Sequence, residues 1–507
     1  MIAYKNQYFI FLCLFIGLFL SGCKDKWEDH NRIQDPVLSE NLILLIQKTP
    51  DLSTFAGYLK ATGYDEVLAS SKTFTVWAPT NLALQNLDQS IVTDPVKLKQ
   101  FVGNHISNQN YLTRNANPVL TIRTLNGKNI LFTKTTFEEA NIVVADQYSD
   151  NGILHIIDLA IIPKLNAWEY LNNSATSLQK SFLLSQNYIY RNLLLAEVTG
   201  IDPKTGNPIY KEGTGYFQGN YFLTRTSDIS SEDGKYTFIL LTDAAFAAEK
   251  AKMLKYFKII DPAKTPARNT FLADSLTNWY IVKDLVLKGD YTINNLPDTL
   301  TSYDSLKIHL DRSAIVETHK VSNGVVYVMN RIDYKMSGKI KPVIIEGENY
   351  VSSNTGAVPY YANYLYTLPS SGGGRNINTR RNPITNATFR EIYFYNGSTS
   401  VNWTHYLPTV NAVTYKVYWV AVRDFNTTAV APALPTMFSQ RVTFVTPTLV
   451  TLPYKQVDIL NYNEVYLGDY TTASYGALDT FLVSFASTTS GLNTLVLDYI
   501  KMVPVIN

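Results

Sequence analysis

The amino-acid sequence predicts a multidomain protein in which two α+β domains precede an all-β jelly-roll sandwich. Two strings, at residues 75–81 and 151–158, recur in degenerate form further along the chain, which indicates a repeated unit. From about Pro342 onward, short runs rich in Tyr, Val and Thr replace helical periodicity, a pattern typical of a sandwich. A chain of 507 residues, 46% of them hydrophobic, has material for about three domains. The predicted boundaries are 36–165 for the first repeat, 166–338 for the second repeat and 342–507 for the sandwich.

The N-terminus carries an apolar run from Phe9 to Leu20. This run is shorter than the ~20 residues of a membrane span and fits the core of a signal peptide. It ends in Leu20-Ser21-Gly22-Cys23, which resembles the lipoprotein box of bacteria, whose cysteine is lipidated after cleavage. We therefore expect a lipoprotein signal peptide over 1–22, lipidation of Cys23 and a tether over 23–35. The alternative is an ordinary signal peptide followed by a chance cysteine.

Residues 24–29, Lys-Asp-Lys-Trp-Glu-Asp, follow the cysteine directly. A lysine with acidic residues at this place resembles the surface-export tag of Bacteroidetes lipoproteins, which implies a lipid-anchored protein of the outer membrane at the cell surface. Cys13 lies in the removable segment and Cys23 would carry lipid, so the mature chain would have no disulfide. The net charge of +2 and the absence of a basic stripe in the sequence argue against nucleic acid as a partner.

The first repeat predicts helices followed by a strand, a turn and a second strand. Ser39 and Asp51 are each expected to cap a helix with apolar residues at helical spacing. The β-rich run 74–78 predicts a strand that ends at Pro79, because proline lacks a ladder donor. Thr80 or Asn81 is then expected to cap a short helix over 82–84.

Asp150-Asn151-Gly152 predicts the turn that feeds a closing strand over 153–162. Gly152 is expected to supply a positive φ. His155 lies inside this strand and is predicted to be a hydrogen-bonded core or sheet histidine rather than a binding residue.

The second repeat carries the degenerate copies. Residues 237–243 follow the first string by 162 residues, and residues 323–328 follow the second by 172. Tyr327 then corresponds to His155, and Asp284 takes the place of His105. A Gly-, Thr- and Ser-rich stretch over 199–236 predicts a long loop or hairpin insertion, a kind of segment that often carries function.

Both strings resemble the signature boxes of fasciclin domains, which run like T-V-F-A-P-T-N-x-A-F and N-G-V-I-H-V-I-D. The resemblance implies a β-sheet wedge flanked by helices in each repeat. The second repeat is diverged, because Leu240 and Leu241 replace the Ala-Pro pair. In the family a Tyr-His pair near the position of His105 is tied to receptor adhesion. Asn104 stands before His105 here, and this departure from the pair puts the carry-over of that role in doubt.

The C-terminal region contains runs that resemble galactose-binding-like modules, including carbohydrate-binding ones. These runs are 344–350, 403–406 and 497–504. Pyranose rings stack on aromatic side chains while polar groups bond their hydroxyls. The alternative is that the aromatic residues are ordinary sandwich core and surface cover. The candidate ligand-binding residues are Tyr360, Tyr361, Tyr364, Arg375 and Trp403.

Three carboxylates could hold a structural Ca²⁺, since calcium takes oxygen ligands and related modules place carboxylates on their first and last strands. They are Glu346, Glu348 and Asp498, and the alternative is that they are simply solvated. No other cofactor is predicted.

Catalytic signatures are missing from the sequence. It contains no G-x-S-x-G, H-E-x-x-H or G-x-x-x-x-G-K pattern, so we predict no catalytic residue and no enzyme activity. The predicted function is a non-catalytic surface lipoprotein that binds a glycan or a cell-surface or matrix protein. An alternative is an accessory subunit of an outer-membrane glycan-uptake system, and a remote alternative is an unrecognised glycoside hydrolase.

Overall fold

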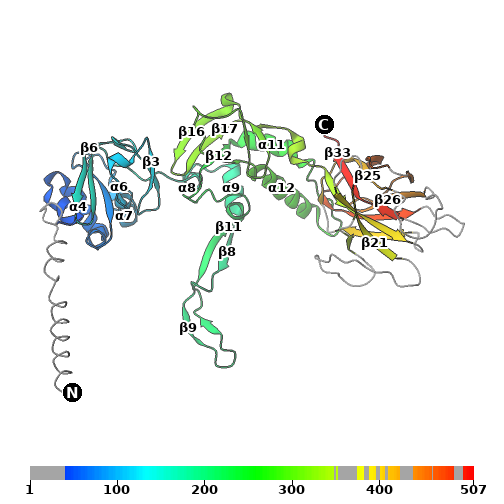
Figure 1. Cartoon of the computed structure of the whole chain (residues 1–507), viewed down its shortest axis with the longest axis horizontal. Helices are drawn as coiled ribbons and strands as arrows, with labels where there is room; N and C mark the ends of the chain where they lie inside the picture. The colour runs from blue at the N-terminus through cyan, green and yellow to red at the C-terminus, as the bar shows by residue number, and fades with distance from the viewer. Residues whose placement is uncertain are drawn as a thin grey trace, which may run out of the picture. The chain divides into compact units, whose positions relative to one another are not determined.

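A computed structural model gives the fold of the chain (Figure 1). The chain divides into two compact units. Unit 1 contains the described residues up to Tyr170 together with 229–234 and 320–323, and unit 2 contains 171–228, 235–319 and the residues from Gly324 onward. The residues that the structure describes are 40–347, 350–351, 374–381, 388–395, 400–405, 409–422, 438–458, 461–484 and 495–506.

Unit 1 is built on a seven-stranded sheet with the order β2-β1-β7-β6-β5-β4-β3. Its centre is the parallel pair of β1 (Phe74–Pro79) and β7 (Gly152–Ile157), in which every residue is buried. Central strands covered on both faces need such continuous apolar runs. The remaining strands are β2 (Ile106–Ser107), β3 (Leu120–Arg123), β4 (Asn129–Phe132), β5 (Thr136–Phe137) and β6 (Ala140–Ser149).

The two faces of β1 pack into separate cores because successive side chains point to opposite sides of a strand. Val76 joins the core that the helices cover, together with Phe55 and Phe101. Trp77 joins a second core with Phe132, on the other side. The helices are α3 (Leu42–Lys48), α4 (Ser53–Thr62), α5 (Tyr64–Leu68), α6 (Gln89–Val92) and α7 (Pro95–Gly103). A further helix, α8 (Ala167–Asn173), begins in unit 1 and ends in unit 2.

Two predicted caps are wrong, although both helices exist. Asn41, not Ser39, caps α3, and its Oδ1 accepts a hydrogen bond from Leu44 N at 3.0 Å. Asp51 lies inside a short 3₁₀ turn, Pro50–Leu52, and does not cap α4. The cap of α4 comes from Asn81 instead, whose Oδ1 accepts from Thr54 N at 2.9 Å. A residue distant in sequence therefore supplies the bond that was expected from a local one.

Two further expectations for the first repeat need correction. Residues 81–86 form turns rather than a helix, although Thr80 Oγ1 accepts the expected bond from Ala83 N at 3.1 Å. Strand β7 ends at Ile157 rather than at 162, and the Asp158 side chain then accepts from Asn141 N at 2.8 Å. The side chains at these two points bond to other segments, which the local pattern does not reveal.

Gly152 is required for close approach rather than for a positive φ. A Cβ at Gly152 would lie 2.1 Å from Phe74 O, because the parallel register sets these two residues opposite each other. Its counterpart Gly324 has both requirements, since its φ is +144° and a Cβ there would lie 1.9 Å from Tyr236 O.

The second repeat contributes a four-stranded sheet with the order β13-β12-β17-β16. Strand β12 (Tyr236–Leu241) runs parallel to β17 (Gly324–Met329), and Thr237 pairs with Val325 as Thr75 pairs with Ile153. The predicted repeat is therefore present down to strand register. The other elements are α9 (Leu178–Ser185), α10 (Tyr221–Arg225), α11 (Asp243–Leu254), α12 (Pro266–Val282), β13 (Val286–Lys288), β14 (Thr299–Thr301), β15 (Lys307–His309), β16 (Ile315–Val321), β18 (Asp333–Tyr334) and α13 (Met336–Lys339).

Helix α12, with 17 residues the longest in the described part of the chain, is too short to cross a bilayer, and no other helix there has the necessary length and hydropathy.

The predicted insertion is a double hairpin, which we call the arm and define as residues 187–220 (Figure 1). Its stem is the antiparallel pair of β8 (Asn187–Arg191) and β11 (Tyr216–Asn220). A second antiparallel pair, β9 (Val198–Ile201) and β10 (Pro208–Tyr210), continues it. The arm begins before the predicted 199 and ends before 236, because the glycines that signalled it mark only its turns.

From Val343 onward, every described regular element is a strand. One antiparallel sheet has the order β19-β33-β25-β29, and another has the order β20-β23-β31-β26-β27, with β28 also paired to β26. Both contribute to one buried cluster, for example through Trp419 and Ile500 from the first and Phe444 from the second. The strands of the two sheets are β19 (Val343–Glu346), β20 (Tyr350–Val351), β23 (Ser400–His405), β25 (Thr414–Val420), β26 (Phe438–Thr446), β27 (Val450–Thr451), β28 (Lys455–Val457), β29 (Val465–Thr471), β31 (Asp479–Ser484) and β33 (Tyr499–Pro504).

Candidate functional site

The residues predicted to bind a ligand fall partly outside the described ranges. Tyr360, Tyr361, Tyr364 and the lipidation residue Cys23 all lie outside them. Arg375 lies in β21 (Gly374–Arg381), which pairs with β22 (Thr388–Tyr395). Trp403 lies in β23, which belongs to a different sheet. The strand pairing thus does not set these two residues side by side.

Of the three predicted calcium ligands, Glu346 lies on β19 and Asp498 lies just before the neighbouring strand β33. Glu346 on β19 is in register with Tyr499 on β33, and Asp498 directly precedes Tyr499. Burial and the nearby Glu464, Asp498 and Glu346 carboxylates raise the pKa of Tyr499. Glu348 lies outside the described residues. Within the described ranges, no group of three or more His, Cys, Asp or Glu side chains is placed to hold a metal ion.

In the first repeat, the side chains of the two strings bond to the backbone of their own domain. Thr75 Oγ1 donates to Gln109 O at 2.6 Å and accepts from Tyr111 N at 2.9 Å. His155 Nε2 donates to Tyr111 O at 2.9 Å, and its Nδ1 accepts from Asp146 N at 3.2 Å. The side chain is fully buried, and burial lowers the pKa of His155, so the ring is neutral at pH 7. The predicted structural role of this histidine is confirmed.

The second repeat makes the same bonds with partly different residues. Thr237 Oγ1 donates to Gly289 O at 2.8 Å and accepts from Tyr291 N at 3.1 Å. The Tyr327 hydroxyl donates to Tyr291 O at 2.7 Å, so a phenol performs the task of the His155 imidazole. Burial raises the pKa of Tyr327 to about 12, which keeps this donor protonated.

The asparagine of the second string also has one role in both repeats. Asn151 Oδ1 accepts from Leu42 N at 2.8 Å, and its Nδ2 donates to Leu68 O at 2.7 Å. Asn323 Oδ1 accepts from Ala167 N at 2.9 Å, and its Nδ2 donates to Ile229 O at 2.8 Å. Each asparagine therefore ties the start of one helix to another segment, the end of α5 in the first repeat and the turn at Ile229 in the second.

His105 and its counterpart Asp284 are both buried. His105 Nδ1 donates to Phe101 O at 2.9 Å and its Nε2 accepts from Ile161 N at 3.1 Å. Burial lowers the pKa of His105 to about 4. Asp284 instead accepts from Lys339 Nζ at 2.7 Å, in an ion pair whose side chains are almost fully buried. An ion pair thus replaces the histidine, and neither group faces solvent.

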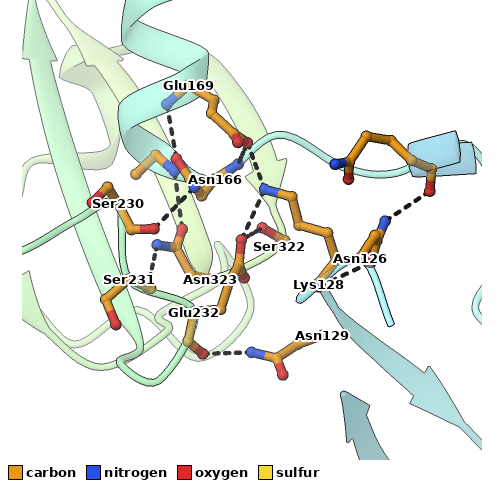
Figure 2. A network of polar contacts seen from close by, with 12 residues as sticks. Asn126, Lys128, Asn129, Asn166, Glu169, Ser230, Ser231, Glu232, Ser322 and Asn323 are labelled. Atoms are coloured by element: carbon orange, nitrogen blue, oxygen red, sulfur yellow. Dashed lines mark hydrogen bonds and ion pairs between the residues drawn. The ribbon is translucent and has the colours of Figure 1, made fainter. Parts of the chain in front are cut away.

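Figure 2 shows a polar network within unit 1 that is centred on Lys128. Its Nζ lies 2.9 Å from Glu232 Oε1 and also pairs with the Glu169 carboxylate. Glu232 Oε1 accepts in addition from Ser322 Oγ at 2.7 Å, and Glu232 O accepts from Asn129 Nδ2 at 2.6 Å. The Lys128 and Glu232 side chains are only 11% and 8% exposed, so the network is structural rather than open to a ligand.

The most exposed apolar surface of the described chain, the arm, was not predicted from the sequence as a site. Large apolar side chains are exposed more densely along the arm than in any other segment of equal length, with Leu194 at 93% and Ile189 at 76%. Contiguous exposed apolar residues mark interaction surfaces. The exposed members are Ile189, Tyr190, Leu193, Leu194, Leu195, Val198, Ile201, Ile209, Tyr216 and Phe217. The Leu193-Leu194-Leu195 run, which lies in the bend between β8 and β9, was the signal that could have revealed it.

Aromatic rings line the stem of the arm. The Tyr190 ring centroid lies 6.0 Å from that of Phe217 and 5.9 Å from that of Tyr188. Tyr188 in turn stacks on Tyr221 at 4.3 Å. A Cβ at Gly219 would lie 2.5 Å from the Tyr188 ring, so the glycine allows this ring to cross the neighbouring strand. The stem is therefore held together by aromatic contacts rather than by a packed core.

Comparison with known proteins identifies part of the chain. Residues 50–163 match the Fasciclin domain family. An uncharacterized protein of Synechocystis sp. is 27% identical over 129 residues, which cover 24% of this chain and 97% of that protein.

Three solved structures are similar at 15% sequence identity. A FAS1 domain pair from the insect cell adhesion molecule Fasciclin I covers 57% of this chain and 99% of its own, with a TM-score of 0.22. A GH26-CBM35 β-(1,4)-mannanase of Podospora anserina covers 33% of this chain and 28% of its own, with a TM-score of 0.16. A family 6 carbohydrate-binding module covers 32% of this chain and 94% of its own, with a TM-score of 0.15. At these TM-scores the likenesses carry no argument about the ligand of this chain.

Proposed function

We propose that the chain is a non-catalytic surface lipoprotein that binds an extracellular ligand, either a glycan or a cell-surface or matrix protein, because residues 50–163 match the Fasciclin domain family. The domain match carries this proposal, since fasciclin domains are associated with adhesion-type binding and are generally non-catalytic. The bonding of Thr75, Asn151 and His155 to backbone groups supports it, because these polar side chains serve the scaffold and not a reaction.

The proposed location is the outer surface of the outer membrane of a Bacteroidetes-type cell. Cys23 would carry the lipid, and residues 23–35 would form the tether. A single anchor of this kind holds several modest binding sites at one surface, where they act together through a high effective concentration.

The proposed glycan site lies in the C-terminal region, which would be a galactose-binding-like jelly roll. Two antiparallel sheets that share one buried cluster support this assignment. Trp403 and Arg375 would contact the sugar together with Tyr360, Tyr361 and Tyr364. Glu346 on β19 and Asp498, directly before β33, would hold a structural Ca²⁺ with Glu348 and so connect the first and last strands of the region.

A glycan-array screen of the full chain tests the proposal. We expect binding that falls about tenfold or more in Trp403→Ala, the loss that about 1.4 kcal/mol of stacking energy would cause. The matched control is Tyr466→Ala, which removes another aromatic residue, 42% exposed, from the same region. Equal losses in both variants would contradict the glycan site at Trp403.

Point variants are preferable to removal of the C-terminal region. Ala412 N donates to Tyr256 O at 2.8 Å, and the Tyr475 ring lies 5.6 Å from that of Phe257, which is buried. A chain that ended near Lys341 would lose these contacts, and its second repeat would expose apolar surface. A loss of binding could then result either from removal of the sugar site or from damage to the second repeat.

A silent array would move the proposal to another partner. If a defined outer-membrane transporter co-purified with the chain at high salt, the function would be that of an accessory subunit in a glycan-uptake system. Hydrolysis of a polysaccharide by the purified chain, abolished by changing one carboxylate, would instead assign it to the glycoside hydrolases.

A further inference from the structure

The stem of the arm has an open backbone edge. Strands β8 and β11 form a two-stranded sheet, and no third described strand joins either of them. Asn192 N donates to Gly215 O at 2.8 Å and Tyr221 N donates to Gln186 O at 3.0 Å. Hydrogen-bonded positions alternate in an antiparallel pair, so the even-numbered residues of β8 bond to β11. Ile189 therefore directs its N–H and C=O away from β11.

This edge combines unpaired backbone groups with exposed apolar side chains. Ile189 at its centre is 76% exposed, and the following Tyr190 is 46% exposed. Native proteins usually cover or charge such edges because they are templates for another strand. The turn that closes the arm, residues 202–207, reads Asp-Pro-Lys-Thr-Gly-Asn, and such a polar end is unsuited to enter a bilayer. A protein strand fits the edge better than a lipid surface does.

We propose that a second copy of this chain covers the edge, with the two β8 strands paired antiparallel about a two-fold axis through Ile189. A four-stranded sheet would then replace the two separate stems. In this register Ile189 lies opposite itself, and Tyr188 lies opposite Tyr190 of the second copy. Arg191 lies opposite Asn187 of the second copy, so no like charges face each other across the pair.

The charge of the arm suits pairing with itself. Lys211 Nζ lies 2.9 Å from Glu197 Oε2, so this pair is neutralised within one arm. Two copies of an arm without net charge can approach about a two-fold axis without repulsion. The arm contains three basic residues and three acidic residues, so its formal net charge is zero. The basic residues are Arg191, Lys204 and Lys211, and the acidic residues are Glu197, Asp202 and Glu212.

The edge strand β8 also carries exposed apolar side chains of its own. Ile189, which is 76% exposed, would meet Ile189 of the second copy in this register, and Tyr190, which is 46% exposed, would meet Tyr188 of the second copy. The outer edge of β11 is a poorer candidate, because its centre is Gln218, flanked by Gly219. The pairing is independent of the ligand class proposed above, since it involves no residue of the C-terminal region.

Cysteine cross-linking of the full chain tests the pairing directly. Residues that face each other in a hydrogen-bonded antiparallel pair have Cα atoms about 5.5 Å apart, within the ~4.4–6.8 Å range that a disulfide allows. We expect Ile189→Cys to give a disulfide-linked dimer on mild oxidation, at least tenfold more than the wild-type chain. The matched control is Gln218→Cys, at the position paired with 189 on the other strand of the stem. No cross-link at 189, or an equal one at 218, would overturn the proposal.

A second pair of variants tests the backbone edge. Ile189→Pro removes the outward N–H and leaves the bonds between β8 and β11, whereas Gln218→Pro does the same on the opposite edge. In sedimentation velocity of the full chain in mild detergent, we expect Ile189→Pro to be monomeric at concentrations where the wild type and Gln218→Pro are dimeric. A monomeric wild type, or loss of the dimer in both variants, would overturn the proposal. Cross-linking of the Ile189→Cys variant to a different protein, in place of a second copy, would overturn it too and assign the edge to that partner.

Discussion

At the scale of single residues, the first repeat holds two neutral histidines in its interior. His105 and His155 are fully buried, and both ring nitrogens of each bond to backbone groups. Burial lowers the pKa of both rings, and that of His105 falls from 6.5 to about 4. The unfolded chain therefore binds protons more readily than the folded one between these two pH values. The stabilisation that each neutral ring provides is complete above pH 6.5 and decreases as the pH falls toward the folded pKa.

The replacement of His105 by glutamine should remove this dependence. Between pH 7 and pH 5 we expect the His105 titration to lower the free energy of unfolding of the wild type by about 2 kcal/mol. His105→Gln has no such titration, so its free energy of unfolding should fall by about 2 kcal/mol less than that of the wild type between pH 7 and pH 5. This difference is expected whatever the stability of the variant at pH 7. Urea unfolding at the two pH values measures the difference. Parallel losses in both proteins would show that His105 does not titrate in this range.

The sequence predicted the buried role of His155 but not the equivalence of His155 and Tyr327. Both side chains donate to a backbone carbonyl on a neighbouring segment, Tyr111 O in one repeat and Tyr291 O in the other. Every residue has a backbone carbonyl, so the sequence does not show which side chains donate to one. The change from His155 to Tyr327 therefore looks like an unrelated substitution in the sequence, although both side chains make the same bond. The shared bond became visible only once the strands were placed.

At the scale of elements, the parallel central pair of each repeat depends on one glycine. Gly152 begins β7 opposite Phe74, whose carbonyl oxygen would lie 2.1 Å from a Cβ. Both strands are wholly buried, so neither can shift without disturbing a core. The close approach of two backbones, and not a turn conformation, fixes glycine at this position.

Gly152→Ala should therefore be strongly destabilising. We expect a loss of about 3 kcal/mol in the free energy of unfolding, the upper part of the range for overpacking. Gly57→Ala is the matched control, because Gly57 is exposed within α4 and a Cβ there meets nothing within 4 Å. That change should stabilise the domain by about 0.5–1 kcal/mol. Chemical denaturation of both variants measures the contrast, and similar values for the two would exclude the steric explanation.

Element types were easier to predict than their ends. The strands at 74–79 and 236–241 follow from dense apolar runs, whereas the cap of α4 comes from Asn81 and could not be read from the local sequence. Asp243 repeats this role, since its Oδ1 accepts from Leu178 N at the start of α9 at 2.7 Å. The arm was predicted only as an insertion, because its glycines mark turns and its exposed leucines follow neither helical nor strand periodicity.

At the scale of the whole molecule, segments far apart in the chain complete unit 1. Residues 229–234 and 320–323 belong to it, although they lie within the second repeat. The Lys128 network connects them to β4 through the Glu232 and Ser322 side chains (Figure 2). Asn323 adds bonds to Ala167 and Ile229. A repeated sequence predicts two similar units, but it does not reveal which loops of one repeat belong with the other.

Lys128 supplies the positive charge of this network. Its ammonium group pairs with both Glu169 and Glu232, and the Glu232 side chain is only 8% exposed. Removal of one partner from a largely buried pair leaves an uncompensated charge. Since Glu169 is 42% exposed and partly screened, we expect Lys128→Met to cost about 2–4 kcal/mol. Glu232→Gln in the same chain should recover part of this loss, because it removes the unpaired charge.

Hydrogen exchange can show whether the network holds the unit together. In Lys128→Met, amides of 229–234 and 320–323 should lose protection together, because both segments bond to Glu232 or to Asn323. Lys211→Met is the matched control, since it breaks an ion pair whose partners are 54% and 57% exposed and should cost no more than about 1 kcal/mol. If the two variants had equal stability and unchanged exchange in both segments, the network would contribute nothing to the arrangement of the unit. A selective loss in Lys128→Met would instead show that one buried charge determines which loops of the second repeat fold with the first.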